Sequence, residues 1–179
     1  MIKGKKVTLR PLMSGDRKMT LKWRNDLVIK KMAMMHPFPV TDVNEKGWYD
    51  DLLGSKNDKT VFFAIENKKK ETVGFISLNN INRTNRNCYL SIVIGDEKNQ
   101  GKGYGKDAIA TILTYAFSIL NLRKVSLEVL KINNKALNLY KVSGFVEEGR
   151  LKEHFFFEGK YHDVVIMSFF NSKKIKESA

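Results

Sequence analysis

A glycine-rich junction between a strand-like and a helix-like segment restricts the possible folds more than any other part of this sequence. Residues 100–106 are Gln-Gly-Lys-Gly-Tyr-Gly-Lys, after an apolar run at 89–94 and before a helical pattern at 107–120. Glycines permit a tight turn and let backbone N–H groups approach a ligand closely. The start of a helix adds unpaired N–H donors and the positive end of its dipole. The junction therefore predicts an anion site, most often a phosphate site.

The spacing of the junction excludes one common phosphate motif and gives only a weak match to another. A P-loop requires Gly-Lys followed by Ser or Thr, but Gly103 follows Lys102 and Asp107 follows Lys106. A dinucleotide fingerprint requires Gly-x-Gly-x-x-Gly, and its last position, counted from Gly103, is Ala108. A glycine-rich turn without any ligand is the remaining alternative.

Length and composition indicate one domain with a hydrophobic core. The chain has 179 residues, of which 42% are hydrophobic, and this suffices for one core. No apolar run reaches the roughly 18 residues of a membrane span, and no apolar signal core follows the basic start. The single Cys88 excludes an internal disulfide and fits a reducing compartment. We therefore expect a cytoplasmic protein without membrane association.

The net charge of +13 attracts anions, but the arrangement of the lysines matters more than their number. Most lysines are scattered, and the sequence has no arginine-rich arm or zinc pattern. Nucleic acid is therefore not expected as a partner. Lys98, Lys102 and Lys106 flank the junction and favour a polyphosphate ligand. The three histidines have no metal-ligand spacing, so no metal is expected.

Hydrophobic periodicity predicts an α/β (α+β) domain at residues 1–170 and a charged tail at 171–179. The expected architecture is a mixed, mostly antiparallel sheet with helices on both faces. Strands are expected at 7–12, 61–65, 72–78, 89–94, 123–130, 145–149, 151–157 and 164–170, and helices at 14–25, 41–53, 107–120 and 134–143, with an apolar loop at 32–39.

Two spaced motifs resemble the GNAT superfamily of N-acetyltransferases, which bind acetyl-coenzyme A. The first is Gln100-x-x-Gly103-x-Gly105, which resembles the pyrophosphate loop of that family. The second is a downstream segment, Asn133-x-x-Ala136-x-x-x-Tyr140-x-x-x-Gly144-Phe145. The resemblance covers residues 60–170 and, more loosely, the whole chain. It implies the GNAT fold and acetyl-coenzyme A as co-substrate.

Other segments resemble particular branches of this superfamily. Residues 116–122, 144–149 and 158–164 are similar to the ribosomal-protein and spermidine acetyltransferase branch. Trp23-Arg24-Asn25-Asp26 resembles relatives that acetylate amino-sugar nucleotides. The acceptor implied is a protein N-terminus or a small amine, such as a polyamine or an amino-sugar nucleotide. The positive net charge argues against a polyamine, although Asp42, Glu45, Asp50 and Asp51 can create a local acidic mouth.

The resemblance also implies which residues bind the cofactor. The strand at 92–94 pairs with the pantetheine arm, and Asn133 holds the pantetheine backbone; the alternative for Asn133 is a helix N-cap. The implied cofactor-binding residues are Ile92, Val93, Ile94, Gln100, Gly101, Lys102, Gly103, Tyr104, Gly105, Lys106, Asn133, Lys135 and Tyr140.

Two residues are candidates for acid–base chemistry. By resemblance, Tyr140 gives a proton to the coenzyme A thiolate, and a phenol has a suitable pKa for this; the alternative is a packed aromatic. Glu128, twelve residues upstream of Tyr140, is the candidate general base. The apolar residues 125, 127 and 129 face one way, so Glu128 enters a cleft or lies on a solvated strand face.

The implied activity is transfer of the acetyl group to a primary amine by direct attack in a ternary complex. The alternative from another class is a coenzyme A-binding module without catalysis. A homodimer formed through the last strands is a further expectation.

Overall fold

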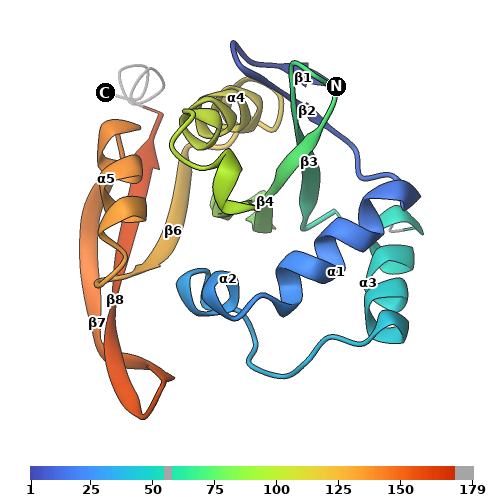
Figure 1. Cartoon of the computed structure of the whole chain (residues 1–179). Helices are drawn as coiled ribbons and strands as arrows, with labels where there is room; N and C mark the ends of the chain where they lie inside the picture. The colour runs from blue at the N-terminus through green and yellow to red at the C-terminus, as the bar shows by residue number, and fades with distance from the viewer. Residues whose placement is uncertain (55–57, 172–179) are drawn as a thin grey trace.

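The computed structural model describes residues 1–54 and 58–171, and these residues form one α/β unit around a single sheet (Figure 1). The predicted fold class is confirmed. The strands are β1 (Ile2–Lys3), β2 (Val7–Arg10), β3 (Val61–Asn67), β4 (Thr72–Asn82), β5 (Asn87–Ile94), β6 (Lys124–Leu130), β7 (Val146–Phe157) and β8 (Lys160–Phe170). The helices are η1 (Ser14–Asp16), α1 (Arg17–Asn25), α2 (Leu27–Met32), α3 (Asp42–Gly54), η2 (Glu97–Asn99), α4 (Tyr104–Ser118) and α5 (Asn134–Val142).

The sheet consists of two antiparallel parts that meet at a short parallel junction. The strand order is β1-β2-β3-β4-β5-β6-β8-β7, and β5 and β6 are the parallel pair. Their pairing joins only residues 87–89 of β5 to residues 124–126 of β6. Beyond these residues the strands diverge, and β6 runs with β7 and β8 apart from the β1–β4 part (Figure 1). Within the described residues, residues 90–94 therefore have no strand partner on the β6 side, and this interruption of the sheet is called the β5–β6 gap.

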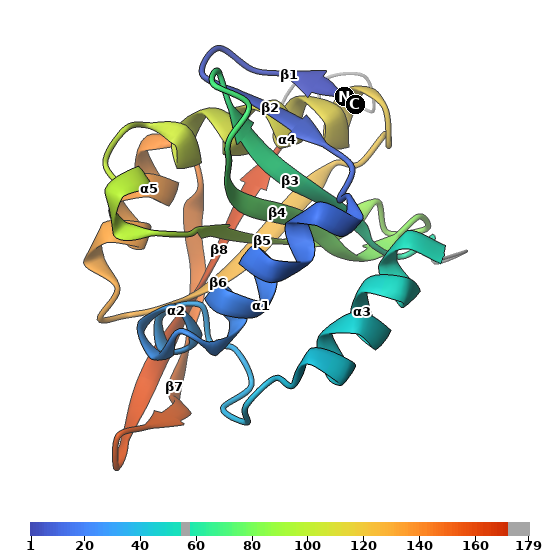
Figure 2. The ribbon, with the colours of Figure 1, turned by 45° about the vertical axis from the view of Figure 1, so that its right-hand side comes forward.

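Helices cover both faces of the sheet, as predicted. The main core joins α4 and α5 to the strands through residues such as Ile109, Ile112 and Leu127. On the other face, Trp23 of α1 packs against Phe75 and Val93, and α3 covers the β3 end of that face. Figure 2 shows α1 crossing in front of the sheet, with α3 beside α1. The apolar stripe of α4 and the alternation along the strands determine which side of each element is buried.

The structure differs from the sequence prediction in several segments. No element is predicted between the helix expected at 14–25 and the loop expected at 32–39, but helix α2 lies there and ends at Met32, the first residue of that loop. It begins where the Asp26 carboxylate accepts a hydrogen bond from the Ile29 N–H. The two strands expected between 145 and 157 are one strand, β7, with irregular register around Gly149 and beyond Leu151. Pairing with β8 carries this strand through its glycine, whereas the local pattern predicts a break. The predicted tail at 171–179 lies almost wholly outside the described residues.

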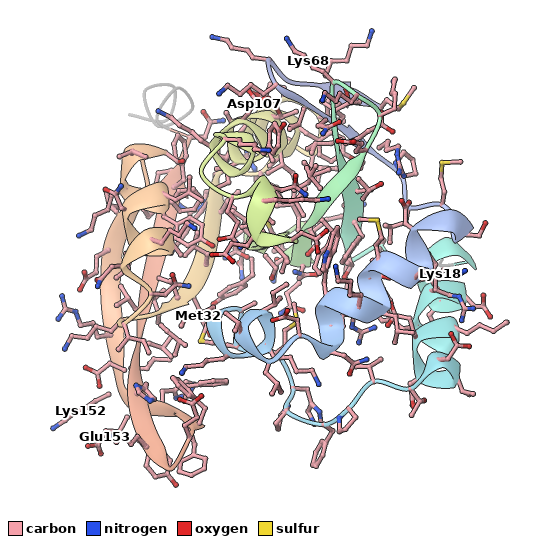
Figure 3. All side chains as sticks on the ribbon, in the orientation of Figure 1. Lys18, Met32, Lys68, Asp107, Lys152 and Glu153 are labelled. Atoms are coloured by element: carbon pink, nitrogen blue, oxygen red, sulfur yellow. The ribbon has the colours of Figure 1, made fainter. Side chains whose placement is uncertain are left out.

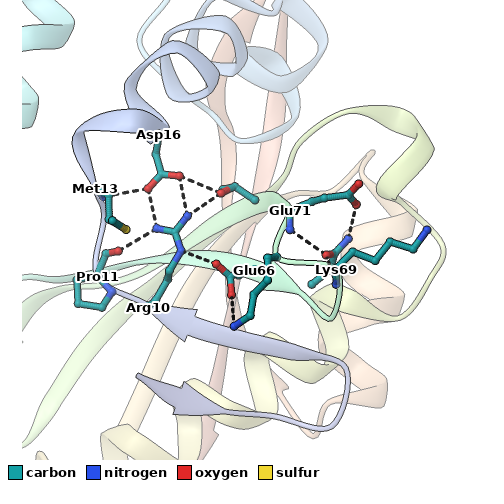
Figure 4. A network of polar contacts seen from close by, with 10 residues as sticks. Arg10, Pro11, Met13, Asp16, Glu66, Lys69 and Glu71 are labelled. Carbon is teal, nitrogen blue, oxygen red and sulfur yellow. Dashed lines mark hydrogen bonds and ion pairs between the residues drawn. The ribbon is translucent and has the colours of Figure 1, made fainter.

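A buried polar network joins β2, η1, β3 and β4 around one arginine (Figure 4). The Arg10 guanidinium donates to both Asp16 carboxylate oxygens at 2.7 and 2.8 Å, and to Glu66 at 2.9 Å. Thr72 donates to the same Asp16 carboxylate at 2.9 Å. The Arg10 and Asp16 side chains are only 11% and 7% exposed. Every charge in the network is paired, as burial requires.

We expect Asp16→Asn to destabilise the fold by about 3 kcal/mol or more, because it leaves the Arg10 cation without its main partner. Burial alone raises the pKa of Asp16, but hydrogen bonds from Arg10, the Met13 amide and Thr72 together lower it. The carboxylate therefore contributes stability above its unfolded pKa of about 3.8, and this contribution is lost as the pH falls through the lower folded pKa. Urea unfolding across acidic pH measures both effects. A variant as stable as the wild type would contradict this role.

Candidate cofactor and acetyl-transfer site

The glycine-rich junction forms a loop that ends at the start of α4. Gly101 and Gly103 have φ values of 74° and 82°, a left-handed conformation that side chains with a Cβ rarely adopt. Gly103 is the residue before the first helical turn, and α4 begins at Tyr104 rather than at the predicted Asp107. The first N–H groups of a helix have no intrahelical acceptor. The loop and the helix start therefore offer a row of N–H donors to an anion, as the sequence predicts.

The other predicted loop residues lie around these donors. Lys135 of α5 donates to the Gln100 side chain at 2.6 Å and so connects the loop to the second motif. Gly105 is buried, and a Cβ there would lie 3.3 Å from Leu139 of α5. Lys102 and Lys106 are exposed. The structure thus brings both sequence motifs together at the N-terminus of α4.

The candidate pantetheine strand lies on the edge of the gap between β5 and β6. Ile92 and Ile94 pack against the core on the α4 side, whereas Val93 points to the α1 side. Their backbone groups on the β6 side have no strand partner within the described residues, because the β5–β6 pairing ends at Tyr89. An unpaired strand edge can bind an extended ligand through main-chain hydrogen bonds.

Tyr140 is buried on α5, on the face of the sheet that α4 covers. Its side chain is 8% exposed and packs against Phe145. Burial raises the pKa of Tyr140 to about 12, so the hydroxyl is protonated at neutral pH. Among the described residues the hydroxyl has no hydrogen-bond partner, which leaves its proton available to a ligand atom.

Glu128 lies on the opposite face of the sheet from Tyr140. Tyr89 pairs with Ser126 across the parallel junction, so strand alternation places Glu128 on the same face as Val93 and helix α1. The Glu128 side chain is exposed, and no ion pair or hydrogen bond to it occurs within the described part of the chain. The two candidate acid–base groups therefore lie on different faces of the sheet, Tyr140 on helix α5 and Glu128 on strand β6.

Asn133 makes the helix N-cap that the sequence analysis gives as its alternative role. Its side-chain oxygen accepts from the Ala136 N–H at 3.1 Å, and its amide donates to the Met32 carbonyl at 3.3 Å. The second contact fixes the end of α2 beside the start of α5. The sequence prediction contains no α2 and therefore misses this contact; the signal for it is Asp26, a residue type that commonly caps helices.

Helix α2 also contacts the tip of the β7–β8 hairpin, which the sequence does not predict. Lys31 donates to Glu158 at 2.6 Å, and its ammonium lies 4.4 Å from the centre of the Phe157 ring. His162 stacks on Phe157 with a centroid distance of 4.0 Å. These contacts hold the tip of the β7–β8 hairpin against α2.

The proposed acidic mouth at α3 is largely neutralised. Glu45 is fully buried and accepts from Thr20 and Arg24. Asp42 pairs with Arg17 at 2.9 Å, and Asp50 pairs with Lys46. The Asp42 and Glu45 pairs join α3 to α1, whereas the Asp50 pair lies within α3. All three carboxylates are therefore paired.

The Trp23-Arg24-Asn25-Asp26 segment is likewise engaged inside the protein. Trp23 is 1% exposed and donates to Asp96, while Arg24 lies over the Trp48 ring at 4.3 Å. Asn25 bonds both backbone groups of Val40, and Asp26 caps α2. The motif therefore determines how the first helices pack, and its side chains are not displayed for an acceptor.

A strand edge without a partner, a glycine loop at a helix start and a buried tyrosine are the features expected of an acyl-coenzyme A transferase. The profile of the acetyltransferase (GNAT) domain matches residues 6–146, and the chain belongs to this family. It is an acetyl-coenzyme A-dependent N-acetyltransferase, and acetyl-coenzyme A is its co-substrate.

Relatives match along nearly the whole chain. The spermidine N(1)-acetyltransferase of Vibrio cholerae is 36% identical over 172 residues, covering 96% of this chain and 97% of that protein. The Escherichia coli K12 spermidine N(1)-acetyltransferase is 29% identical, over 96% of this chain and 89% of that one. The crystal structure of the Vibrio cholerae enzyme with coenzyme A and spermine superposes with a TM-score of 0.87 at 34% identity, covering 95% and 98% of the two chains.

No helix in the described ranges 1–54 and 58–171 is long and apolar enough to cross a membrane.

Proposed function

We propose that the amine acceptor of this enzyme is a polyamine, with spermidine as the first candidate. The observation that carries this proposal is the full-length similarity to the spermidine N(1)-acetyltransferase of Vibrio cholerae, at 36% identity over 96% of this chain. A solved structure of a relative contains coenzyme A together with spermine. A protein N-terminus is the weaker alternative, because the ribosomal-protein alanine N-acetyltransferase of Escherichia coli matches only 62% of this chain.

A polycationic acceptor needs local negative charge, since the whole chain carries +13 and repels it at long range. Glu128 supplies such a charge in this proposal. It is exposed, it has no partner within the described residues, and it lies on the α1 face beside the β5–β6 gap. In this role it attracts the protonated amine and accepts, directly or through water, the proton that the amine loses before attack.

In this proposal the amine is deprotonated on one face of the sheet, and the thiolate leaving group is protonated on the other. In this proposal the thioester lies along the β5 edge, and an N–H at the gap stabilises the oxyanion that forms when the amine attacks. Tyr140 then protonates the departing thiolate from the α5 side. The protonated phenol, which has no competing acceptor within the described residues, supports this role. Asn133 and Lys135 support the loop and the start of α5 around the pantetheine arm.

Assembly and location remain predictions for this chain. A homodimer is expected from the exposed β7 edge, where Val146 and Phe156 are 55% and 57% exposed. A dodecameric structure is known for the Vibrio cholerae spermidine N-acetyltransferase. The cytoplasm remains the expected compartment.

Thiol release from acetyl-coenzyme A over an acceptor panel tests the polyamine proposal. We expect saturable release with spermidine and spermine, and little with an N-terminal peptide or an amino-sugar nucleotide. Glu128→Gln should raise KM for spermidine about tenfold or more, because it removes the charge that holds the amine. Glu153→Gln, the loss of another exposed carboxylate (Figure 3), is the matched control. A preference for the peptide or the nucleotide would contradict the proposal.

A further inference from the structure

The turn between β1 and β2 lies against the first turn of α4, although the two segments are about 100 residues apart in sequence. The Asp107 carboxylate accepts hydrogen bonds from three consecutive backbone N–H groups, those of Lys5, Lys6 and Val7, at 3.1, 2.7 and 2.9 Å. Gly4 permits this approach, because a Cβ there would lie 2.4 Å from an Asp107 oxygen. The contact holds the turn at the end of α4 that carries the glycine loop.

The side chain of Lys6 continues from this turn onto the loop itself. Its ammonium donates to the Lys102 carbonyl at 2.9 Å. It is also so close to the backbone that a Cβ on Gly103 would lie 2.9 Å from Nζ. In a trans peptide the C=O and the following N–H point in opposite directions, and the described chain contains no cis peptide. Lys6 therefore fixes the Lys102–Gly103 peptide with its N–H directed away from the β1–β2 turn.

The orientation of this peptide matters for an anion ligand. An N–H group attracts a phosphate oxygen, whereas a carbonyl in the same place repels it. Left-handed glycines on both sides of Lys102 make the loop backbone permissive, so an external contact is needed to favour one orientation. Lys6 provides that contact and adds a positive charge beside the loop.

We infer that Lys6 is a positioning residue for the coenzyme A diphosphate, and that Asp107 holds it in place. Lys6 keeps the Lys102 carbonyl away from the ligand and the Gly103 N–H available to it. The β1–β2 turn then belongs to the cofactor site, because it carries Lys6, although it lies outside both sequence motifs. The inference rests on the cofactor assignment of the loop and adds two residues to it.

Calorimetric titration with coenzyme A tests the role of the Lys6 side chain. We expect Lys6→Met to weaken binding about tenfold, as for one lost charge-assisted contact, and Lys6→Arg to recover most of the affinity. The Asp107 contacts involve backbone amides, so this substitution leaves them intact and the melting temperature should not change. Lys68→Met is the control, since Lys68 is an exposed lysine at the same end of the molecule (Figure 3). It should change affinity less than about twofold, as expected for an exposed charge.

Two further measurements separate positioning from other effects. Dephospho-coenzyme A retains the diphosphate and lacks the 3′-phosphate, so Lys6→Met should weaken its binding by the same factor. In turnover, the effect should fall on KM for acetyl-coenzyme A and not on kcat. If Lys6→Met weakened the binding of coenzyme A but not of dephospho-coenzyme A, Lys6 would act at the 3′-phosphate and the inference would be wrong. Equal affinities of Lys6→Met and Lys68→Met for coenzyme A would also overturn it.

The direction in which Asp107→Asn changes coenzyme A affinity distinguishes a positioning role of Asp107 from a purely electrostatic effect of its charge. A carboxylate in the first turn of α4 repels a bound anion, so charge alone predicts that Asp107→Asn strengthens coenzyme A binding. The positioning role predicts weaker binding, and a smaller loss when Lys6 is already Met. Tighter binding by Asp107→Asn would refute the role of Asp107. Failure of the wild type to bind coenzyme A would instead refute the assignment of the loop.

Discussion

We expect Gly103→Val to weaken coenzyme A binding by about two orders of magnitude or more. Gly103 has a φ of 82°, which costs a β-branched residue about 1–3 kcal/mol, and its new side chain would meet the Lys6 ammonium at 2.9 Å. The Lys6 side chain must move away from the loop, and the strained backbone must change its conformation, so we expect the loop N–H groups no longer to converge. Each charge-assisted bond to a phosphate is worth about 1.5–3 kcal/mol, and losing two of them gives the expected effect. Calorimetric titration with coenzyme A measures the loss.

Gly159→Val is the matched control for this substitution. Gly159 has a similar φ of 76°, and a Cβ there has no neighbour within 4 Å, so the variant carries the same backbone strain in the β7–β8 turn. Coenzyme A affinity should stay at the wild-type level in this control. If Gly103→Val bound coenzyme A as tightly as the control does, the loop would not be the diphosphate site.

We expect Tyr140→Phe to lower kcat by about 100-fold or more, because general acid catalysis contributes at this level. Coenzyme A affinity should change less than about twofold. The ring remains and continues to pack against Phe145. The lost hydroxyl has no partner within the described residues, so its removal leaves no polar group unpaired. Stopped-flow or steady-state thiol release, with a parallel coenzyme A titration, separates the two quantities.

The pH dependence of turnover provides a second criterion for Tyr140. Burial raises the pKa of Tyr140 to about 12, so the proton donor stays loaded at neutral and moderately alkaline pH. Deprotonation of Tyr140 should therefore lower the rate only at pH values well above 10. Tyr115→Phe is the control, because it removes a hydroxyl from another tyrosine, whose ring packs against Phe63. Wild-type kcat in Tyr140→Phe would remove Tyr140 from the mechanism.

The features that the sequence predicts well are those whose causes are local. The glycines at 101 and 103 favour a turn through their left-handed backbone, and the apolar stripe of α4 favours packing on a sheet. The two motifs therefore predict the glycine turn before α4 and the class of fold; the cofactor role of this turn remains a prediction. Resemblance adds Tyr140, whose role as a proton donor remains a prediction supported by its burial and its protonated state.

The features that the sequence does not predict depend on contacts between distant segments. Helix α2 has only six residues, too few for a periodic apolar stripe, and it is held by Asn133 from the other half of the chain. The Lys6 contact to Lys102 joins residues 96 positions apart. The acidic residues of α3 give a pattern that suggests an exposed mouth, yet Arg17 and Arg24 neutralise two of them, and only the fold places these arginines there.

Initial-velocity kinetics with acetyl-coenzyme A and spermidine varied together provide the most direct test of the proposed activity. We predict spermidine-dependent thiol release with intersecting double-reciprocal lines, as direct attack in a ternary complex requires. Parallel lines would indicate a covalent acetyl-enzyme and contradict the mechanism. No release with spermidine, from protein that binds coenzyme A, would contradict the acceptor.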